Sequence, residues 1–388
     1  MNFNEPIVQS FKVAYNYKLH FTNHLFSQEN NLFKDILTDY NASGATKVLF
    51  VLDDGVHNHH PNLVADIQQY CQLNENHIQF TDVLIVPGGE QSKNSADYIN
   101  NVLKGIDSNK ICRHSFVVAI GGGAVIDMVG YAAAIAHRGV KLIRIPTTVL
   151  SQNDSAVGVK NSVNIFGKKN FLGTFAPPYA IINDSAFLDT LEERDWVSGI
   201  AEAVKVALIR DKEFFEFLQE NAIALGTRNK EKMQCLIYRC AELHMQHIAQ
   251  GGDPFESGSS RPLDFGHWAA HKLEHMTNYK LRHGEAVAIG MALDLAYAHL
   301  LGFIDLATLK SILKVLEDVG FSLVLPIKTD GELNELLGGI EEFREHLGGK
   351  LTITLISEIG VKCDIHEIDM SKMKQASELL ITLLTQKV

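Results

Sequence analysis

Residues 115–136 read SFVVAIGGGAVIDMVGYAAAIA and join an apolar strand, a glycine turn and a helix of small residues. The run 116–120 has the length and composition of a buried parallel strand, and three glycines follow it at 121–123. This arrangement presents backbone N–H groups and a helix N-terminus to a phosphate. The pattern is GGGxxxD, ending at Asp127, and it departs from the GxGxxG dinucleotide fingerprint. The turn indicates either a nucleotide site or close packing of a helix on a strand.

Apolar runs on both sides of this stretch have the same character. The runs at 47–54, 83–86 and 142–145 are predicted strands, and helical patterns separate them. Residues 11–22, FKVAYNYKLHFT, add an earlier strand in which apolar and polar side chains partly alternate. Alternating strands and helices are typical of an α/β domain with a mainly parallel sheet.

The second half of the chain has a different pattern. From about residue 185 the strand signals fade, and apolar residues recur with the 3.6-residue period of helices. A chain of 388 residues is also too long for one ordinary core. We therefore predict an α/β domain at 1–183 and a mainly helical domain at 184–388.

Composition narrows the class of protein. Hydrophobic residues at 46% and charged residues at 21% describe a globular chain, and the net charge of −11 argues against a nucleic-acid surface. The five cysteines are odd in number and include no CxxC pair, so neither a disulfide framework nor a zinc ribbon is indicated. No signal peptide or membrane span is apparent, and we expect a cytoplasmic protein.

The stretch 261–285, RPLDFGHWAAHKLEHMTNYKLRHGE, holds four histidines among arginine and carboxylate side chains. His267, His271 and His275 are four residues apart, so on a helix they lie along one face. Imidazoles at this spacing can share a divalent metal ion. The alternative is a polar helix face with its histidines in solvent. Spacing alone leaves both interpretations open.

Two other segments carry notable charges. Residues 154–170, DSAVGVKNSVNIFGKKN, place Asp154 and three lysines around glycines, which fits either a solvated loop or a cradle for a phosphorylated, hydroxylated ligand. Residues 198–210 put Glu202 and Lys205 three apart on one face of an otherwise apolar helix. Since unpaired buried charges are costly, these two side chains are predicted to pair or to face a site.

Together the motifs resemble the 3-dehydroquinate synthase family, the sugar phosphate cyclases. The resemblance covers about residues 47–355, in the ordered blocks GGGAVIDMVGYAAA, RGVKLIRIPTTVL, DSAVGVK, GKKNFLG, SGIAEAVK and DFGH…H…HGEAVAIGM. It implies an N-terminal α/β nucleotide-binding domain with a Rossmann-like, mainly parallel sheet and an all-helical C-terminal metal-binding domain. It also implies an enzyme that uses NAD and a divalent metal ion, with zinc expected first and cobalt as an alternative.

The implied reaction is a ring closure with loss of phosphate. NAD⁺ oxidises a ring alcohol held on the metal, which acidifies the adjacent C–H, and phosphate is eliminated. NADH then reduces the ketone, the ring opens, and an intramolecular aldol step closes a carbocycle. The metal polarises the substrate oxygens, and basic side chains neutralise the phosphate.

The resemblance further implies roles for single residues. The implied metal ligands are Glu202, His267 and His283, which leaves His275 without a role. The implied dinucleotide contacts are Asp53, Glu90, Lys93, Gly122, Gly123, Asp127, Thr147, Thr148 and Lys169. The implied catalytic groups are His271, Lys205, Asp154 and Lys160, and the implied substrate contacts are Asn170, Arg261, Asp264, His346, His247 and Arg138. In the family the arginine at the place of Arg138 reaches the neighbouring subunit, which implies a homodimer.

Three positions depart from 3-dehydroquinate synthases. Asp264 stands where they have asparagine, and His346 and His247 stand where they have lysines. These changes remove positive charge from a pocket that holds a carboxylate and a phosphate, and each lost charge-assisted hydrogen bond costs about 1.5–3 kcal/mol. We therefore predict a seven-carbon ketose phosphate without a carboxylate, such as sedoheptulose 7-phosphate, as in the 2-epi-5-epi-valiolone synthase branch.

Three alternatives remain. One is 3-dehydroquinate synthase itself, acting on 3-deoxy-arabino-heptulosonate 7-phosphate. Another is a metal-dependent polyol dehydrogenase, which shares the architecture and a glycine turn, although Glu202, Lys205 and the lysine cradle argue against it. The third is a non-catalytic sugar-phosphate-binding protein, against which the intact metal and NAD positions argue.

Overall fold

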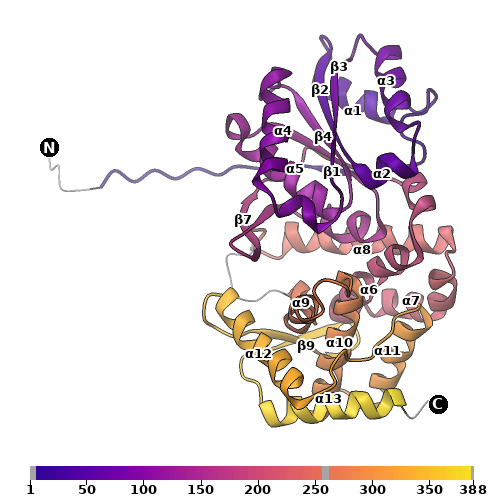
Figure 1. The fold of residues 1–388 in the computed structure, drawn as a ribbon, viewed down its shortest axis with the longest axis vertical. Helices are drawn as coiled ribbons and strands as arrows, with labels where there is room; N and C mark the ends of the chain where they lie inside the picture. The colour runs from indigo at the N-terminus through magenta and orange to yellow at the C-terminus, as the bar shows by residue number, and fades with distance from the viewer. Residues whose placement is uncertain (1–5, 256–261, 386–388) are drawn as a thin grey trace.

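The computed structural model describes residues 6–255 and 262–385. A six-stranded sheet, in the order β1-β8-β5-β4-β2-β3, forms the upper part of Figure 1, and every strand pairing in it is parallel. Its strands are β1 Lys18–Thr22, β2 Thr46–Asp53, β3 Ile78–Val86, β4 Phe116–Gly121, β5 Lys141–Pro146 and β8 Ala180–Asp184. The parallel α/β fold predicted from the sequence is confirmed.

Helices cover both faces of this sheet, which explains the unbroken apolar runs of its central strands. They are α1 Leu32–Tyr40, α2 Asp54–His59, α3 Leu63–Leu73, α4 Ala96–Ser108 and α5 Gly123–Ile135, with short helical turns η1 Glu90–Lys93 and η2 Ala136–Arg138. Val48, Phe50 and Leu52 of β2 share a core with α1 and α3. Leu49 and Val51 point to the opposite core, with α4 and α5.

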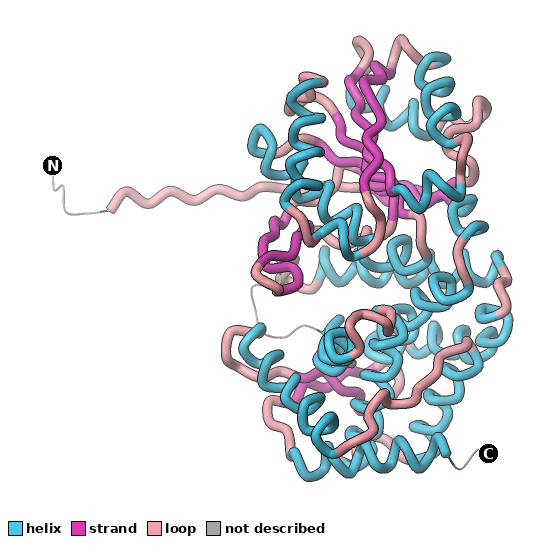
Figure 2. Tube along the Cα trace, in the orientation of Figure 1, coloured by secondary structure: helices cyan, strands magenta, loops and turns pink. Residues whose placement is uncertain are grey.

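The observed strand β1 is shorter than the strand predicted at residues 11–22. Only Lys18–Thr22 pairs, with β8, while residues 6–17 have no secondary structure. Figure 2 shows this segment as an extended arm that runs away from the body of the molecule. The strand prediction is therefore wrong for residues 11–17 within a single chain, because no strand of the described residues pairs with them.

Residues 154–170 are not the solvated loop that was one interpretation of their sequence. They form the end of a turn, η3 Ser151–Ser155, and most of an antiparallel hairpin, β6 Lys160–Ile165 with β7 Lys168–Phe175. The buried guanidinium of Arg144 on β5 holds this segment, since it donates hydrogen bonds to the carbonyls of Ala156, Gly158 and Lys160 at 2.6–3.1 Å. The segment is thus fixed to the sheet.

The second part of the chain is mainly helical, as predicted. After η4 Ser185–Thr190 come α6 Glu193–Arg210, α7 Lys212–Gly226, α8 Lys230–Gln250, η5 Pro262–Asp264, α9 His267–Met276, α10 His283–Leu300, α11 Leu306–Asp318, α12 Asp330–His346 and α13 Met370–Thr385. A two-stranded sheet, β9 Ile353–Glu358 with β10 Val361–Ile365, interrupts the helices. None of the helices in the described ranges is long and apolar enough to cross a membrane.

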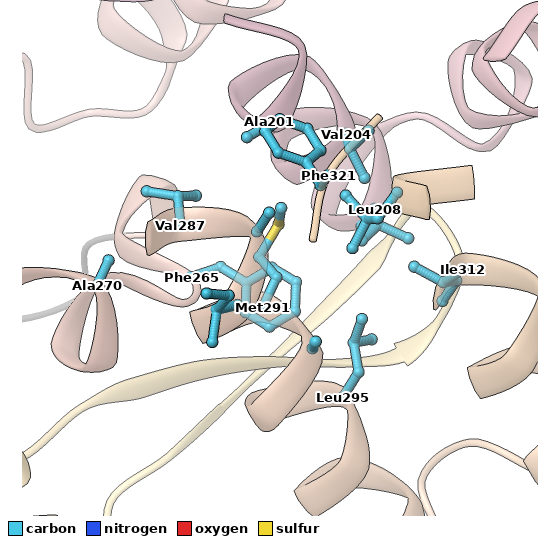
Figure 3. Close-up of a cluster of buried hydrophobic side chains, with 14 of the residues drawn as sticks. Ala201, Val204, Leu208, Phe265, Ala270, Val287, Met291, Leu295, Ile312 and Phe321 are labelled. Atoms are coloured by element: carbon cyan, nitrogen blue, oxygen red, sulfur yellow. The ribbon is translucent and has the colours of Figure 1, made fainter. Parts of the chain in front are cut away.

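Helices α6 and α10 form the centre of this second part. Both are buried along almost their whole length, as expected of helices that are apolar on every side. Figure 3 shows Val204 and Leu208 of α6 close to Met291 and Leu295 of α10, with Phe321 beside them. Three charged side chains on these two helices, Glu202, Lys205 and Asp294, are therefore held in the protein interior.

Candidate active site

One carboxylate and two imidazoles from three helices meet in the interior. Oε1 of Glu202, on α6, lies 3.8 Å from Nε2 of His267 and 3.6 Å from Nε2 of His283. These two histidines begin α9 and α10. One ligand atom from each residue lies within 4.8 Å of the others, which suits a single divalent ion. The structure thus brings together the three side chains that the family resemblance implied as ligands.

Two glycines permit this convergence. Gly266 has a φ of +78°, and a Cβ there would lie 2.7 Å from the backbone nitrogen of Met291. A Cβ on Gly284 would lie 2.0 Å from the carbonyl oxygen of Ser198. Because neither position can carry a side chain, α9 approaches α10 closely and α10 approaches α6 closely. That close contact places His267 beside the α6 carboxylate.

The electrostatics of the group favour a bound cation. Glu202 and Lys205 are both fully buried and form an ion pair. Burial opposes ionisation of Glu202, but Lys205 and then His283 outweigh it and lower the pKa of the carboxyl to about 2. Burial, then Lys205, lowers the pKa of His267 well below its usual value. An ionised carboxylate and a neutral imidazole are the states that metal binding requires. Burial opposes the charge on His283, but Glu202 and then Glu274 outweigh it and raise the pKa of this ring to about 9, so His283 must lose a proton when a metal ion binds.

Glu202 Oε1 is also an unsatisfied buried acceptor. Its nearest imidazole nitrogens, at 3.6 and 3.8 Å, are too far for hydrogen bonds, and it has no other partner among the described residues. Buried carboxylate oxygens without a partner are rare in native proteins. A metal ion bound to this oxygen would satisfy it, and the two imidazole nitrogens nearby are suitable further ligands.

Glu274 on α9 supports His283 from the other side, and sequence reasoning missed it. Its Oε2 lies 3.4 Å from Nδ1 of His283, while its Oε1 accepts a hydrogen bond from Lys169 Nζ at 3.0 Å. A carboxylate on Nδ1 turns Nε2 of the same ring toward Glu202. The available signal was spacing, since Glu274 follows His271 by three residues on the same helix face. Lys169, implied as a dinucleotide contact, here joins β7 to α9.

His271, Glu274 and His283 form a second group with metal-binding spacing. The Glu274 carboxylate is already neutralised by Lys169, so we assign no ion to this group. The ring of His271 lies 5.6 Å from that of His267 and is exposed, at the open side of the first group. His275 is also exposed and belongs to neither group.

Asp154 has a partner that the sequence did not reveal. Its Oδ1 lies 2.9 Å from Nδ1 of His244, a largely buried histidine on α8. Burial and the charge of Glu202 act to raise the pKa of Asp154, but Lys205 and His244 lower it overall. Asp154 and His244 therefore belong to the same buried polar centre as the first metal-binding group. The only sequence signal was that His244 and His247 lie three apart on one helix.

Replacing His244 by phenylalanine is expected to lower kcat about 10- to 100-fold, the usual effect of losing the partner of an active-site group. The ring volume stays similar, but Asp154 loses the group that holds its carboxylate. His244→Gln should restore part of the activity, because an amide N–H can still donate to the carboxylate. Cys235→Ala, at an exposed position on the same helix, is the control. Unchanged steady-state kcat and KM in His244→Phe would contradict the prediction.

A cavity of about 400 Å³ lies at the carboxyl ends of β2, β4 and β5, where α/β proteins bind nucleotides. Its lining includes five implied dinucleotide contacts, which are Asp53, Gly122, Gly123, Thr147 and Thr148. The N-terminus of α5 opens into it. Ser198, one turn before Glu202, and Arg282, just before His283, also line it. The cavity thus extends from the glycine turn to residues that neighbour Glu202 and His283 in the sequence.

Of the four other implied dinucleotide residues, Glu90, Lys93 and Asp127 lie in a polar cluster next to the hairpin, and Lys169 lies on β7, where it pairs with Glu274. Lys93 Nζ donates to Asp127 Oδ2 at 2.7 Å and contacts Asn170, which was implied as a substrate contact. Glu90 accepts a hydrogen bond from Asn164 at 2.8 Å. These pairings connect η1, α5 and both hairpin strands. None of the four implied residues lines the cavity in the described part of the chain.

The remaining implied site residues are dispersed. Arg138 is exposed at the amino end of β5, whereas the cavity lies at the carboxyl end of that strand. Asp264 is half-buried in η5, and its charge contributes to raising the pKa of Lys205, after the opposing effect of burial and the larger effects of Glu202 and Asp154. His247 is half-buried on α8, and Lys160 is exposed at the start of β6. Arg261 and the side chain of His346 lie outside the described residues.

A buried carboxylate, Asp294 on α10, fixes the start of α9. It accepts hydrogen bonds from Gly266 N at 3.0 Å and Trp268 Nε1 at 2.8 Å, on either side of His267. Burial outweighs both donors and raises the pKa of Asp294 to about 7. A pKa above the unfolded value means that Asp294 favours folding most below about pH 4, and that this contribution is lost as the pH rises through about 7.

Asp294→Asn should remove that pH dependence. We expect the difference in unfolding free energy between variant and wild type to change by roughly 2–4 kcal/mol between pH 4 and pH 8, in favour of the variant at pH 8. Urea unfolding followed by tryptophan fluorescence measures it. Asp318→Asn, at a surface pair with Lys314, is the control. Parallel pH curves for Asp294→Asn and wild type would contradict the assignment.

Comparisons with known proteins agree with this architecture. The family profile "3-dehydroquinate synthase N-terminal" matches residues 83–198, and "3-dehydroquinate synthase C-terminal" matches residues 199–340. The 3-dehydroquinate synthase of Dictyoglomus turgidum is 38% identical over 296 residues, which is 75% of this chain and 81% of that protein. The enzyme of Campylobacter fetus is 39% identical over 242 residues, 62% of this chain and 67% of that protein.

Among solved structures, 2-epi-5-epi-valiolone synthase from Streptomyces hygroscopicus, with NAD⁺ and Zn²⁺ bound, has a TM-score of 0.85 at 25% identity and covers 97% of this chain and 99% of its own. A 2-deoxy-scyllo-inosose synthase has a TM-score of 0.75 at 21% identity, covering 93% and 95%, and shares the fold. These similarities define the class of protein: a parallel α/β sheet of the nucleotide-binding type joined to a helical part that carries the metal-binding group. The chain belongs to the 3-dehydroquinate synthase family of sugar phosphate cyclases, which are phosphate-eliminating enzymes. The resemblance seen in the sequence motifs is confirmed.

Proposed function

We propose that this enzyme converts a seven-carbon sugar phosphate into a carbocycle with release of phosphate, with NAD and a divalent metal ion as cofactors. The observation that carries the proposal is the buried group of Glu202, His267 and His283, two of which lie on the same helix as, or next in sequence to, the cavity-lining residues Ser198 and Arg282. The NAD⁺ and Zn²⁺ bound in the solved 2-epi-5-epi-valiolone synthase, and the NAD⁺ and Co²⁺ in the solved 2-deoxy-scyllo-inosose synthase, support these cofactors.

In this proposal the two parts of the chain bind different ligands. Residues 1–183 bind the dinucleotide, whose pyrophosphate lies against the glycine turn and the N-terminus of α5. Residues 184–388 bind metal and substrate. When bound, the metal polarises a substrate hydroxyl and, later, a ketone.

The chain's own residues position the substrate and move protons. Lys205 keeps Glu202 ionised and adds positive charge where an oxyanion develops. His271, exposed at the open side of the metal-binding group, is placed to take or give a proton at the departing phosphate. The carboxylate of Asp154, held by His244, accepts a hydrogen bond from a substrate hydroxyl. Lys160, Asn170 and Arg261 are assigned to the phosphate and hydroxyl groups by the family pattern.

The assembly proposed is a homodimer. Its support is the position of Arg138, which lies at the amino end of β5 and thus at the wrong end of the sheet for the cavity of its own chain. A residue so placed acts at a site only if that site belongs to another copy.

The curated relatives favour 3-dehydroquinate synthase activity. Those quoted above are 3-dehydroquinate synthases at 38% and 39% identity, well above the 25% of the solved 2-epi-5-epi-valiolone synthase. The better supported substrate is therefore 3-deoxy-arabino-heptulosonate 7-phosphate. This reverses the preference that the three substituted positions suggested.

One observation supports sedoheptulose 7-phosphate as the second candidate substrate. Asp264 adds a negative charge close enough to Lys205 to affect its pKa, and a negative charge there opposes the binding of an anionic head. The high TM-score of the 2-epi-5-epi-valiolone synthase structure also supports it. A polyol dehydrogenase is less well supported, because the solved NADH-dependent butanol dehydrogenase from Thermotoga maritima, at 14% identity, shares the fold alone.

The deciding experiment supplies each sugar phosphate separately to the purified protein with NAD⁺ and Zn²⁺. Released phosphate and absorbance of NADH are followed together. A cyclase releases phosphate without net NADH, because the cofactor is regenerated in each turnover. Phosphate release from only one sugar identifies the substrate. Net NADH accumulation with a simple polyol, or no phosphate from either sugar, would overturn the proposal.

A further inference from the structure

The arm at residues 6–17 has a strand-like sequence from residue 11 onward, but it has no partner strand among the described residues of its own chain. Phe11, Val13 and Tyr15 occupy alternate positions, separated by Lys12 and Ala14, in the partial alternation of a half-buried strand. They are nevertheless 86%, 61% and 56% exposed, and the arm extends away from the body in Figures 1 and 2. A sequence pattern suited to a buried strand face, left in solvent, indicates that the missing partner lies outside this chain.

The base of the arm is fixed next to the β6–β7 hairpin. The hydroxyl of Tyr17 donates a hydrogen bond to the carbonyl of Val157 at 3.2 Å. The ring of Tyr15 lies 6.1 Å from that of Phe255, which in turn lies 5.2 Å from the ring of Phe175 at the end of β7. The arm therefore leaves the molecule beside β7, in a defined direction.

Strand β7 has one edge without a partner strand among the described residues. Among the described residues it pairs only with β6, so its other edge offers unpaired backbone groups. Phe171, Leu172 and Phe175 on this strand are 50%, 39% and 46% exposed. One chain thus carries both an unpaired strand and an unpaired apolar strand edge, side by side.

We propose that the arm of each copy lies along strand β7 of a second copy, so that two chains exchange arms around a two-fold axis. The two features are self-complementary, which is the requirement for such an interface. Twelve extended residues span about 40 Å, long enough to cross to a neighbouring molecule. The inference does not depend on which sugar phosphate the enzyme uses.

The surface area that the two exchanged arms would bury is sufficient for a stable dimer. Five apolar side chains of the arm are more than half exposed, namely Ile7, Val8, Phe11, Val13 and Tyr15. At about 100–200 Å² each, two exchanged arms bury about 1,000–2,000 Å² on the arms alone, against a standard interface of roughly 1,600 Å² in total.

Arm exchange would also reach the active site. Strand β7 carries Lys169, whose ammonium holds Glu274 next to His283. An arm seated on β7 would restrict the movement of this strand and so of Lys169. If the proposed function holds, specific activity falls on dilution below the dimer dissociation constant.

The direct test is a photo-crosslink between isotopically distinct chains. Phe11→p-benzoylphenylalanine in an unlabelled chain is mixed with ¹⁵N-labelled wild-type chain, allowed to exchange, and irradiated. Mass spectrometry of the crosslinked peptides is expected to join the unlabelled arm to labelled peptides from residues 160–175. Links confined to unlabelled chain, or labelled peptides from another surface, would overturn the proposal. No activity is measured, so failure here is separate from failure of the proposed reaction.

A matched pair of variants tests the energetics. Val13→Asp should raise the dimer dissociation constant about tenfold or more, since a buried valine is replaced by a charge at both arms. Val324→Asp makes the same change at a residue that is 66% exposed in the helical part, against 61% for Val13, and should leave the constant unchanged. Sedimentation velocity measures both. A monomeric wild type, or equal effects of the two variants, would overturn the proposal.

Discussion

Replacing His267 with alanine is expected to remove the bound metal ion and to lower turnover by about three orders of magnitude or more. The reason is geometric, because His267 is one of the three side chains that form this group among the described residues, with Glu202 and His283. Two remaining ligands on a buried site cannot hold a divalent ion against dialysis. Metal content by mass spectrometry and kcat with each sugar phosphate are the measurements.

Two neighbouring histidines on the same helix provide the controls. His271→Ala should keep the metal and lose turnover, since this ring lies beside the metal-binding group without belonging to it. His275→Ala should change neither, because the side chain is exposed. One metal ion retained per chain in His267→Ala would refute the assignment, and loss of metal in His275→Ala would show that the spacing argument was right after all.

The contrast among these histidines shows what a sequence can and cannot predict. Spacing correctly placed His267 and His271 on one helix. It could not select His283 over His275, because His283 begins the next helix and reaches the site only through the close contact of α9 with α10. Glu202 lies far away in the chain, and its role came from family motifs. Ligand sets depend on tertiary packing, which periodicity does not encode.

The sheet was more predictable than the site for a related reason. A strand covered by helices on both faces is an unbroken apolar run, and the runs at 47–54 and 116–120 became β2 and β4. His244 and Glu274 were missed because single polar residues on helices have many structural explanations. The pattern at 11–17 was recognised, yet a strand also needs a partner, and the described residues of a single chain provide none.

Asp264→Asn is expected to shift substrate selectivity toward the carboxylate-bearing heptulosonate phosphate by about 10- to 100-fold, as the ratio of kcat/KM for the two sugar phosphates. Asp264 places a negative charge close to Lys205, the cation buried beside the metal-binding group. Removing that charge lessens repulsion of an anionic head and leaves a neutral head nearly unaffected. The shift is expected whichever sugar the wild type prefers, because it compares two substrates at the same site.

This ratio separates substrate recognition from damage to the enzyme. A variant that merely destabilises the site lowers both kcat/KM values together and leaves their ratio unchanged. Asp318→Asn, which removes a carboxylate from a surface pair with Lys314, controls for the change in net charge. If Asp264→Asn alters the ratio by less than about twofold, the energy involved is under about 0.4 kcal/mol, below any charge-assisted contact. Asp264 would then not face the substrate head, and the sedoheptulose phosphate candidate would lose the observation that supports it.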